Sequence, residues 1–320
     1  RLQFHPWLEP VAIIGSPETA GKSHDECLWS LDEERPPPSQ LTIGGLENLP
    51  SLIEEFHSLG VRIIFSALPD EPAARVEIDL AAAGFLVVSH AQVHRLETDI
   101  PLIVPEVNIQ DLSILKKQSE GSEGRLISCS NCTVSPIAIT LYPLMQIADI
   151  TSVKIVTQQA LSGGGRTLLA EGREGRQINS EIPGEAESII SELSKILSCE
   201  FDIEASCERV MRDYGHYARI EVEFQEKVSA HQVIRAWRES YSRSQELNLP
   251  SATKRPIIFV DGELDDNHRW VGFEQHKNPG LDLKAAMAVA VGEVGINGSR
   301  LRFSTMAENT IRGAAGYSVL

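Results

Sequence analysis

The sequence predicts a doubly wound α/β domain followed by an α+β domain with helices on one face of a sheet. The chain has 320 residues, whereas a single hydrophobic core stops growing at roughly 250 to 300 residues. Its first third alternates short apolar runs with helical segments, and from about Thr151 longer strands of alternating polarity replace this pattern. The change in periodicity therefore indicates two architectures within one chain.

The first domain is predicted from three short apolar runs that end in small residues, as buried parallel strands do. They are Val11–Gly15, Val61–Ser66 and Leu86–Ser89. Segments with helical character, Leu49–Leu59 and Ala73–Ala83, lie between them. This alternation is typical of a doubly wound sheet, an architecture that binds nucleotides at the carboxyl ends of its strands.

The second domain is predicted from longer strands, notably Val153–Thr157 and Ala218–Phe224, with a helix over Glu185–Leu197 between them. Alternating strands of this kind suit an antiparallel sheet with helices on one face. The tail from Asn309 to Gly316 is helix-like, and its glycines and alanines permit close packing or approach to a ligand.

Two breaks interrupt the pattern of the first domain. Pro36-Pro37-Pro38 predicts a stiff loop, and the polar stretch from Ser119 to Gly124 predicts a surface insertion. The chain shows no internal repeat.

Composition excludes several classes of function. The formal charge of −16 repels a phosphate backbone, so we expect no nucleic-acid partner. No apolar run approaches the ~20 residues of a membrane helix, so we expect no membrane association. Five cysteines are an odd number for a disulfide framework, and a chain of this size needs none, so we expect a reducing, cytoplasmic location.

The segment Ser128-Cys129-Ser130-Asn131-Cys132-Thr133 is a turn of small polar residues just before an apolar run. A cysteine at a helix start has its thiolate stabilised by unpaired N–H groups and the helix dipole, which makes it a nucleophile. Two other interpretations are a redox or metal-binding C-x-x-C pair, and simple burial of small residues. A metal site lacks a second pair of ligands at suitable spacing, so no metal is expected.

Two further segments could serve a site. The strand ending at Gln159 runs into Gly163-Gly164-Gly165, and consecutive glycines let a backbone approach a ligand, although a flexible loop is the alternative. His216 stands at a strand entry, seven residues after Arg209. A lone histidine is more often structural, but beside an arginine it would combine a proton carrier with a carboxylate clamp.

Taken in order, these segments resemble aspartate-semialdehyde dehydrogenases, especially those of the archaeal and fungal type, over nearly the whole chain. The matching stretches are Ser66–Pro69, His94-Arg95, Ile100–Asn108, Asn131–Thr133, Gln159–Gly163, Cys207–Val210, Gly215-His216, Leu249–Ala252, Arg255–Ile258 and Asn309–Gly316. Each stretch is weak by itself, but their shared order is specific.

The resemblance implies a reaction and its catalytic residues. The thiolate of Cys132 attacks the aldehyde of aspartate 4-semialdehyde, a hydride passes to NADP, and phosphate releases the thioester as aspartyl 4-phosphate. Biosynthesis runs in reverse, towards lysine, methionine and threonine. His216 is the implied acid/base, which suits a group titrating near neutrality, and Gln159 positions the reacting group.

The resemblance also implies the residues that bind the small-molecule substrate and phosphate. Arg209 holds the α-carboxylate, Arg95 the phosphate and Glu185 the amino group, while Asn131 completes the set. Asn309 is implied near the nicotinamide amide. The other implied cofactor-binding residues are Ser16, Thr19, Ser66, Leu68, Ser162 and Gly163.

The implied division of the chain has a Rossmann-like NADP-binding domain at residues 1–133, completed by a C-terminal helix at 305–320, and a catalytic and dimerisation domain at 134–304. The resemblance further implies a homodimer or homotetramer.

The sequence departs from the family pattern in several places. The family's first strand and its G-x-x-G-x-x-G turn have no counterpart, because His5-Pro6-Trp7 aligns with the end of the helix that follows that turn. Glu18 stands where the family has a basic residue for the 2'-phosphate of NADP, which favours NAD as the alternative cofactor. A non-catalytic or repurposed homologue that does not bind the dinucleotide normally is the alternative function.

Substitutions also lie near the implied substrate site. Ser188 replaces a family lysine, Glu308 a family histidine, and Met211-Arg212 a Pro-Val pair, while the tract from Asp265 to Gly280 displaces a family segment.

Overall fold

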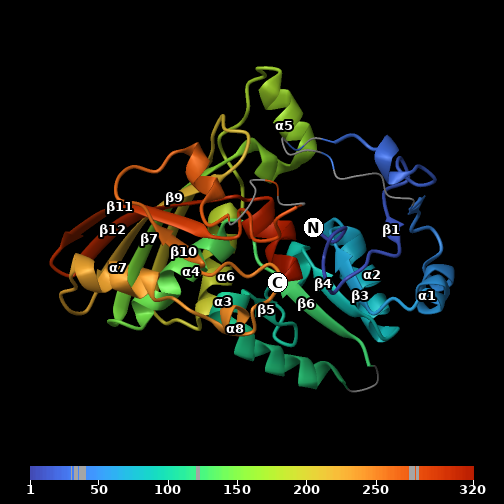
Figure 1. Cartoon of the computed structure of the whole chain (residues 1–320), viewed down its shortest axis with the longest axis horizontal. Helices are drawn as coiled ribbons and strands as arrows, with labels where there is room; N and C mark the ends of the chain where they lie inside the picture. The colour runs from blue at the N-terminus through green and yellow to red at the C-terminus, as the bar shows by residue number, and fades with distance from the viewer. Residues whose placement is uncertain (30, 32–34, 36–40, 120–122, 274–277, 279–280) are drawn as a thin grey trace. The chain divides into compact units, whose positions relative to one another are not determined.

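The computed structural model describes residues 1–29, 31, 35, 41–119, 123–273, 278 and 281–320 (Figure 1). The predicted proline loop at 36–38, part of the predicted insertion at 119–124 and part of the tract at 265–280 lie outside these residues. The chain forms two compact units. Unit 1 contains residues 1–101 and 113–128, and unit 2 contains residues 102–112 and 129–320.

Unit 1 has the parallel strands that the sequence predicts. β3 (Ile63–Ser66), β4 (Leu86–Ser89) and β6 (Arg125–Cys129) pair in parallel with β4 in the centre. β1 (Ile13–Ile14) and β2 (Ile43–Gly44) form a separate parallel pair. The apolar runs therefore form parallel strands, as predicted.

The helices of unit 1 follow from caps and apolar spacing. α1 (Leu49–Ser58) begins after Asn48, whose side chain accepts a hydrogen bond from the Ser51 N–H, and it buries Leu52 and Phe56 one turn apart. α2 (Asp70–Ala82) carries acidic residues in its first turn, where the helix dipole favours them. Short 3₁₀ turns, η1 (His24–Glu26) and η2 (Gln92–His94), complete the local structure.

Unit 2 is built on a six-stranded mixed sheet of order β10-β11-β12-β9-β7-β8. Its strands are β7 (Ile150–Gln159), β8 (Asp202–Arg209), β9 (His216–Phe224), β10 (Ile257–Phe259), β11 (Val289–Asn297) and β12 (Arg300–Ala307). β7 with β8 and β10 with β11 run parallel, and the other neighbours run antiparallel. The predicted α+β layout is confirmed, although the sheet is mixed rather than wholly antiparallel.

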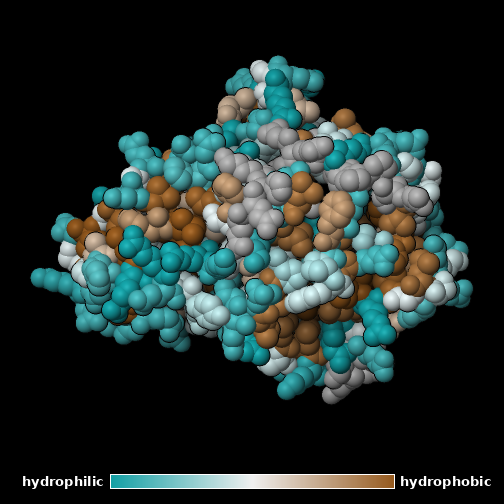
Figure 2. Space-filling view, in the orientation of Figure 1, coloured by the Kyte–Doolittle hydropathy of each residue, from teal (hydrophilic) through white to brown (hydrophobic). Residues whose placement is uncertain are grey.

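Three helices pack on this sheet: α4 (Val134–Met145), α6 (Glu185–Leu197) and α7 (Ala230–Arg238) (Figure 1). α6 buries Ile189, Leu193 and Ile196 at helical spacing against inward strand residues such as Ile155. Burial of each such side chain contributes about 1.5–3 kcal/mol relative to exposure. The surface over the outer side of α7 is mostly hydrophilic (Figure 2), as expected of an amphipathic helix.

The remaining elements connect these strands and helices. They are β5 (Leu102–Ile103), α3 (Pro105–Asn108), η3 (Ile109–Ser119), η4 (Leu161–Gly164), α5 (Gly165–Arg173), α8 (Arg243–Glu246), η5 (Asp266–Trp270), η6 (Ile311–Ala315) and η7 (Tyr317–Val319).

The C-terminal residues differ from the predicted helix at 305–320. Thr305 and Met306 belong to β12, where they pair with Ala218 and Tyr217 of β9. The chain then makes a π-helical turn, η6, and a 3₁₀ turn, η7, both of which pack within unit 2. The strand forms because cross-strand hydrogen bonds are available up to Ala307. The predicted continuous helix at 305–320 is therefore wrong. The cofactor-binding role of residues 1–133 and the catalytic role of residues 134–304 stay predictions.

Within the described residues, no helix is both long and apolar enough to cross a membrane. All five cysteines are described and are free thiols.

Candidate active site

The ends of several strands meet at one edge of the sheet in unit 2. β7 and β8 run parallel, so Gln159 and Arg209, which are register partners, both lie at their carboxyl ends. β9 runs antiparallel to β7 and begins at this edge with His216. β12 ends here as well, because Ala307 pairs with His216. Strand register therefore brings Gln159 beside Arg209 and His216 beside Ala307, although each pair is far apart in the sequence.

Cys132 occupies the turn that starts α4, as the sequence predicts. The Asn131 carbonyl accepts a 3.0 Å hydrogen bond from the Val134 N–H. The Asn131 side-chain oxygen accepts a 2.8 Å bond from the Thr133 N–H. These bonds flank Cys132 and fix the direction of its side chain.

His216 lies against the cysteine sulfur. Its Nε2 is 3.2 Å from Cys132 Sγ, and the imidazole is 4% exposed. Its Nδ1 accepts a 3.1 Å hydrogen bond from the Ala160 N–H. Because Nδ1 accepts, the ring proton of the neutral imidazole is on Nε2, which faces the sulfur.

The environment keeps this imidazole neutral. Burial, followed by the charges of Arg209 and Arg212, lowers the pKa of His216 to about 3. The predicted titration near neutrality is therefore wrong for the protein without substrate. The buried site and its two cations disfavour a third positive charge, so His216 presents an N–H donor to the sulfur.

Arg209 is held by the backbone of the same residue, Ala160, that orients His216. Its Nη1 donates a 2.8 Å hydrogen bond to the Ala160 carbonyl. Burial lowers the pKa of Arg209, and the negative charges of Cys132 and Glu185 oppose that shift. The electrostatic link between the guanidinium and the sulfur favours a thiolate beside it.

Glu185, the first residue of α6, accepts hydrogen bonds from two side-chain amides. Its carboxylate accepts a 2.6 Å hydrogen bond from Gln159 Nε2 and bonds of 3.0 and 3.1 Å from Asn131 Nδ2. One carboxylate therefore fixes both amides, and Asn131 immediately precedes Cys132.

Gly163 must lack a side chain for this arrangement. A Cβ at this position would lie 2.8 Å from Arg209 Nη1 and 2.9 Å from His216 Nε2. Ser162 beside it exchanges hydrogen bonds of 3.0–3.2 Å with Asn309. Gly163 therefore approaches the site closely, whereas a Cβ on Gly165 would meet no atom within 4 Å. The sequence could not distinguish the role of Gly163 from that of a flexible loop.

Comparison with known proteins places this site in a family. The chain is 30% identical to the aspartate-semialdehyde dehydrogenase of Archaeoglobus fulgidus over all of this chain and 91% of that protein. It is 31% identical to that of Trichophyton rubrum, over all of this chain and 90% of that protein. The chain belongs to the aspartate-semialdehyde dehydrogenase family.

Other matches agree with this family, and one relative has a different name. Residues 1–114 match the family model "Semialdehyde dehydrogenase, NAD binding domain". The Candida albicans aspartate-semialdehyde dehydrogenase solved with NADP aligns at a TM-score of 0.78 and 26% identity, over 98% of this chain and 90% of that one. The chain is also 29% identical to a malonyl CoA reductase (NADP) of Metallosphaera sedula, over all of this chain and 90% of that protein.

The other implied site residues of this family member lie in unit 1. Ser16 and Thr19 share a turn after β1, with their hydroxyl oxygens 3.4 Å apart. Ser66 and Leu68 lie at and after the carboxyl end of β3. Arg95 donates a 2.9 Å hydrogen bond to the His90 carbonyl. Burial and the Arg95 charge lower the pKa of His90 to about 4, so that imidazole is neutral.

Glu18 lies exposed in the Ser16–Thr19 turn. A hydrogen bond from the Ser16 side chain is the main cause that lowers the pKa of Glu18, so the carboxylate is ionised at neutral pH. The turn therefore carries a negative charge at the position where the family has a basic residue.

Sequence reasoning missed three supports of the site. They are the Ala160 peptide, Glu192, whose Oε2 accepts a 2.7 Å hydrogen bond from the Asn131 N–H, and Gly313. A Cβ on Gly313 would lie 2.6 Å from the Cys132 carbonyl oxygen. The small residues of the tail signalled close packing for Gly313, whereas peptide groups occur at every residue and give no signal for Ala160.

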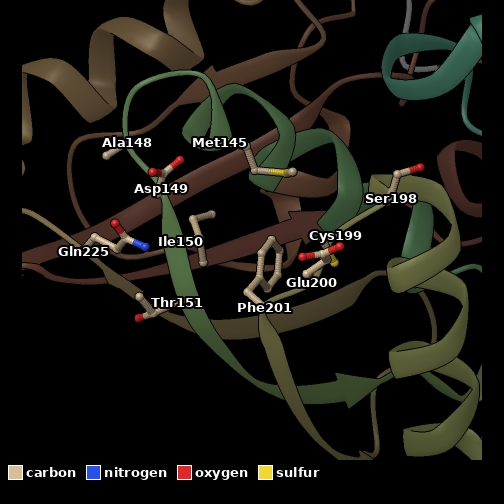
Figure 3. Close-up of a pocket in the computed structure, with 10 residues that line it drawn as sticks. All are labelled: Met145, Ala148, Asp149, Ile150, Thr151, Ser198, Cys199, Glu200, Phe201 and Gln225. Carbon is tan, nitrogen blue, oxygen red and sulfur yellow. The ribbon is translucent and has the colours of Figure 1, made fainter.

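A pocket of about 490 Å³ lies at the other end of β7, at Ile150, with Cys199 and Phe201 among its lining residues (Figure 3). It contains none of the implied site residues. Among the described residues, no group of three or more His, Cys, Asp or Glu is placed to hold a metal ion.

Proposed function

We propose that this protein interconverts aspartyl 4-phosphate and aspartate 4-semialdehyde through a thioester on Cys132, with NADP as the redox partner. The observation that carries the proposal is the 3.2 Å approach of Cys132 Sγ to His216 Nε2, with Arg209 held beside them. Membership of the family supplies the substrate class.

In the oxidative direction, the Cys132 thiolate adds to the aldehyde carbon, and the carbonyl oxygen becomes the alkoxide of a hemithioacetal. The Nε2–H of His216, already directed at the sulfur, donates a hydrogen bond to this new oxyanion. When bound, NADP would supply the acceptor for the hydride of the same carbon. A phosphate oxygen then attacks the thioester carbon, and the carbon–sulfur bond breaks to return the thiolate.

Charged residues of the site match the charges of the substrate. The guanidinium of Arg209 pairs with the α-carboxylate, and the carboxylate of Glu185 pairs with the α-ammonium group. Glu185 is already oriented by Gln159 and Asn131. We assign phosphate binding to Arg95, whose side chain is anchored on the His90 carbonyl.

Several described residues fit a dinucleotide. Ser66 Oγ is buried at the carboxyl end of β3 and has no hydrogen-bond partner among the described residues, which suits a ligand acceptor or donor at that edge. In unit 2, Ser162, Gly163 and Asn309 offer hydroxyl, peptide and amide groups beside His216. The ionised Glu18 favours a ribose hydroxyl over a 2'-phosphate, so NAD competes with NADP.

The test is phosphate-dependent reduction of NADP by aspartate 4-semialdehyde. We expect Cys132→Ala to lower kcat by about 10³-fold or more, because no other group forms the thioester. Cys199→Ala, which removes a partly buried thiol from the pocket near Ile150, is the matched control and should retain wild-type activity. Equal rates for Cys132→Ala and the wild type would disprove the thioester mechanism.

Malonyl-CoA reduction is the second candidate, because the Metallosphaera sedula relative with that name spans the whole chain. The same cysteine would take the malonyl group from coenzyme A as a thioester. A malonyl group has no amine, however, so it leaves Glu185 without a cationic partner. Oxidation of NADPH by malonyl-CoA, measured beside the semialdehyde assay, decides between the two substrates.

We further infer a place in amino-acid biosynthesis leading to lysine, methionine and threonine, a homodimer or homotetramer, and a cytoplasmic location. The substrate class supports the first inference, and the free thiols support the last. Light scattering of the purified protein tests the oligomeric state.

A further inference from the structure

A short segment of unit 2, residues 265–270, packs against the strand ends that carry the site. It consists of Asp265 and the 3₁₀ helix η5 (Asp266–Trp270), and η5 contacts β12 and β11. The Asp265 carboxylate closes the segment by accepting hydrogen bonds from the Asn267 N–H, at 2.8 Å, and from the backbone of His268. The segment is thus a folded unit with its own cap.

Arg269 of this segment neutralises a buried carboxylate. Its Nη1 lies 3.2 Å from Glu308 Oε2, and the side chains of Arg269 and Glu308 are 16% and 1% exposed. The guanidinium carbon is 5.3 Å from the ring centre of Tyr214 and 5.2 Å from that of Trp270. Two aromatic rings therefore flank the guanidinium that pairs with the buried Glu308 carboxylate.

Glu308 connects Arg269 to the turn that contains Asn309. Its Oε1 accepts hydrogen bonds from the Thr310 N–H, at 3.2 Å, and from the Thr310 hydroxyl, at 2.9 Å. These bonds shape the turn that presents Asn309. The Asn309 side-chain oxygen in turn accepts a 2.9 Å hydrogen bond from the Gly215 N–H. Gly215 is the residue before His216.

The 265–270 segment also contacts the loop that precedes His216. Gly215 has a φ of +89°, and a Cβ there would lie 3.4 Å from Arg269 Cδ, so the methylene chain of Arg269 lies along the Gly215 backbone. Nearby, Arg212 Nε forms a 2.6 Å ion pair with Asp266 Oδ1. The loop of residues 212–215 is therefore held by the 265–270 segment at two points.

We propose that Arg269, acting through Glu308, is a positioning residue that sets the orientation of His216 and Asn309 beside Cys132. Its contribution appears in the chemical step rather than in substrate binding, because no contact to the implied substrate residues Arg209 or Glu185 passes through it. The kinetic part of this inference rests on the proposed function, whereas the geometric part concerns only Cys132 and His216.

The first measurement is steady-state kinetics of Arg269→Met in the phosphate-dependent assay. We expect kcat to fall about tenfold or more with KM for the semialdehyde within about twofold, since small misplacements of catalytic groups have effects of this size. Arg269→Lys, which keeps the charge, should recover part of the loss. Arg300→Met removes an exposed arginine that pairs with Glu221 and Glu223 at the other end of β12, and it should match the wild type.

The second measurement needs no substrate. Iodoacetamide alkylation of each cysteine is followed by peptide mass spectrometry, and we expect the rate at Cys132 to change by about threefold or more in Arg269→Met. The buried Cys129 reports general loosening and should stay unreactive. If the wild type shows no turnover of the semialdehyde, this measurement still decides the positioning role.

If Arg269→Met does not fold, because it strands the buried Glu308 carboxylate, the double variant Arg269→Met/Glu308→Gln carries both measurements. Wild-type kcat and a wild-type Cys132 alkylation rate in a folded double variant would overturn the proposal. A change confined to KM, or a parallel rise in Cys129 alkylation, would also overturn it.

Discussion

Ala160 shows how the backbone of one residue orders two side chains of the site, His216 and Arg209. Its N–H donates to His216 Nδ1 and its carbonyl accepts from Arg209 Nη1. The first bond selects the tautomer with the proton on Nε2, and the second places a cation beside the sulfur. At the scale of residues, the tautomer of His216 and the position of Arg209 are therefore set by backbone geometry.

Gly163→Ala tests the close packing around this pair. An added methyl group would overlap Arg209 Nη1 and His216 Nε2, at 2.8 and 2.9 Å. We expect kcat/KM for the semialdehyde to fall about 10²-fold, because both side chains must move. Gly295→Ala, where a Cβ meets no atom within 4 Å, is the control and should keep wild-type kinetics. Unchanged kinetics in Gly163→Ala would show that Arg209 and His216 can shift without loss of activity, against this expectation.

The neutral state of His216 predicts a pH dependence of stability. Its folded-state pKa of about 3 lies below 6.5, the ordinary value of a histidine. Between these values the unfolded chain binds a proton that the folded chain does not, so the free energy of unfolding falls as the pH is lowered. The contribution is complete above pH ~6.5 and declines towards pH ~3, on the order of 1 kcal/mol per pH unit.

Urea unfolding at pH 7 and pH 4.5 measures this effect. His216→Gln should show a smaller loss of unfolding free energy between the two pH values than the wild type. Equal losses in the two proteins would mean that His216 carries a proton in the folded state.

At the scale of elements, the chain after β12 packs against the backbone of Cys132. Gly313 packs on the Cys132 backbone, and the Tyr317 hydroxyl hydrogen-bonds with Ser130. Arg312 anchors the segment through two hydrogen bonds to the Glu106 carboxylate, at 2.7 and 2.6 Å, with both side chains buried. The C-terminal segment thus serves as a packing element of unit 2.

Arg312→Met should reduce the free energy of unfolding by about 3–5 kcal/mol, because it leaves the Glu106 carboxylate buried without its cation. Urea denaturation at pH 7 measures the loss. The double variant Arg312→Met/Glu106→Gln should recover part of it, since no uncompensated charge remains. A double variant less stable than the single one would contradict this explanation.

At the scale of the whole molecule, the implied cofactor residues are divided between the two units. Ser16, Thr19, Ser66 and Leu68 belong to unit 1, and Ser162, Gly163 and Asn309 belong to unit 2. A dinucleotide bound by the residues of either unit should stabilise that unit against unfolding.

Thermal unfolding with NADP and with NAD tests this expectation. A nucleotide at 100 times its Kd adds about 2.7 kcal/mol to stability. We expect Glu18→Arg to increase the shift with NADP and not with NAD, because it replaces a repelling charge with one that pairs with the 2'-phosphate. Absence of a shift with either nucleotide would favour the alternative of a homologue that does not bind the dinucleotide.

The sequence by itself determined the local elements of this protein and singled out the cysteine that we propose as the nucleophile. The apolar runs of unit 1, the helix at Glu185–Leu197 and the cysteine at the start of α4 each follow from short-range pattern. The resemblance to the family rested on ordered motifs, which the comparisons confirm.

Only the tertiary structure decided how these residues act on one another. The tautomer and low pKa of His216, the contacts that require Gly163 and Gly313, and the pairing of Arg269 with Glu308 join positions far apart in the chain. Burial, strand register and backbone hydrogen bonds set these properties, and they exist only once the sheet has brought its strand ends to one edge.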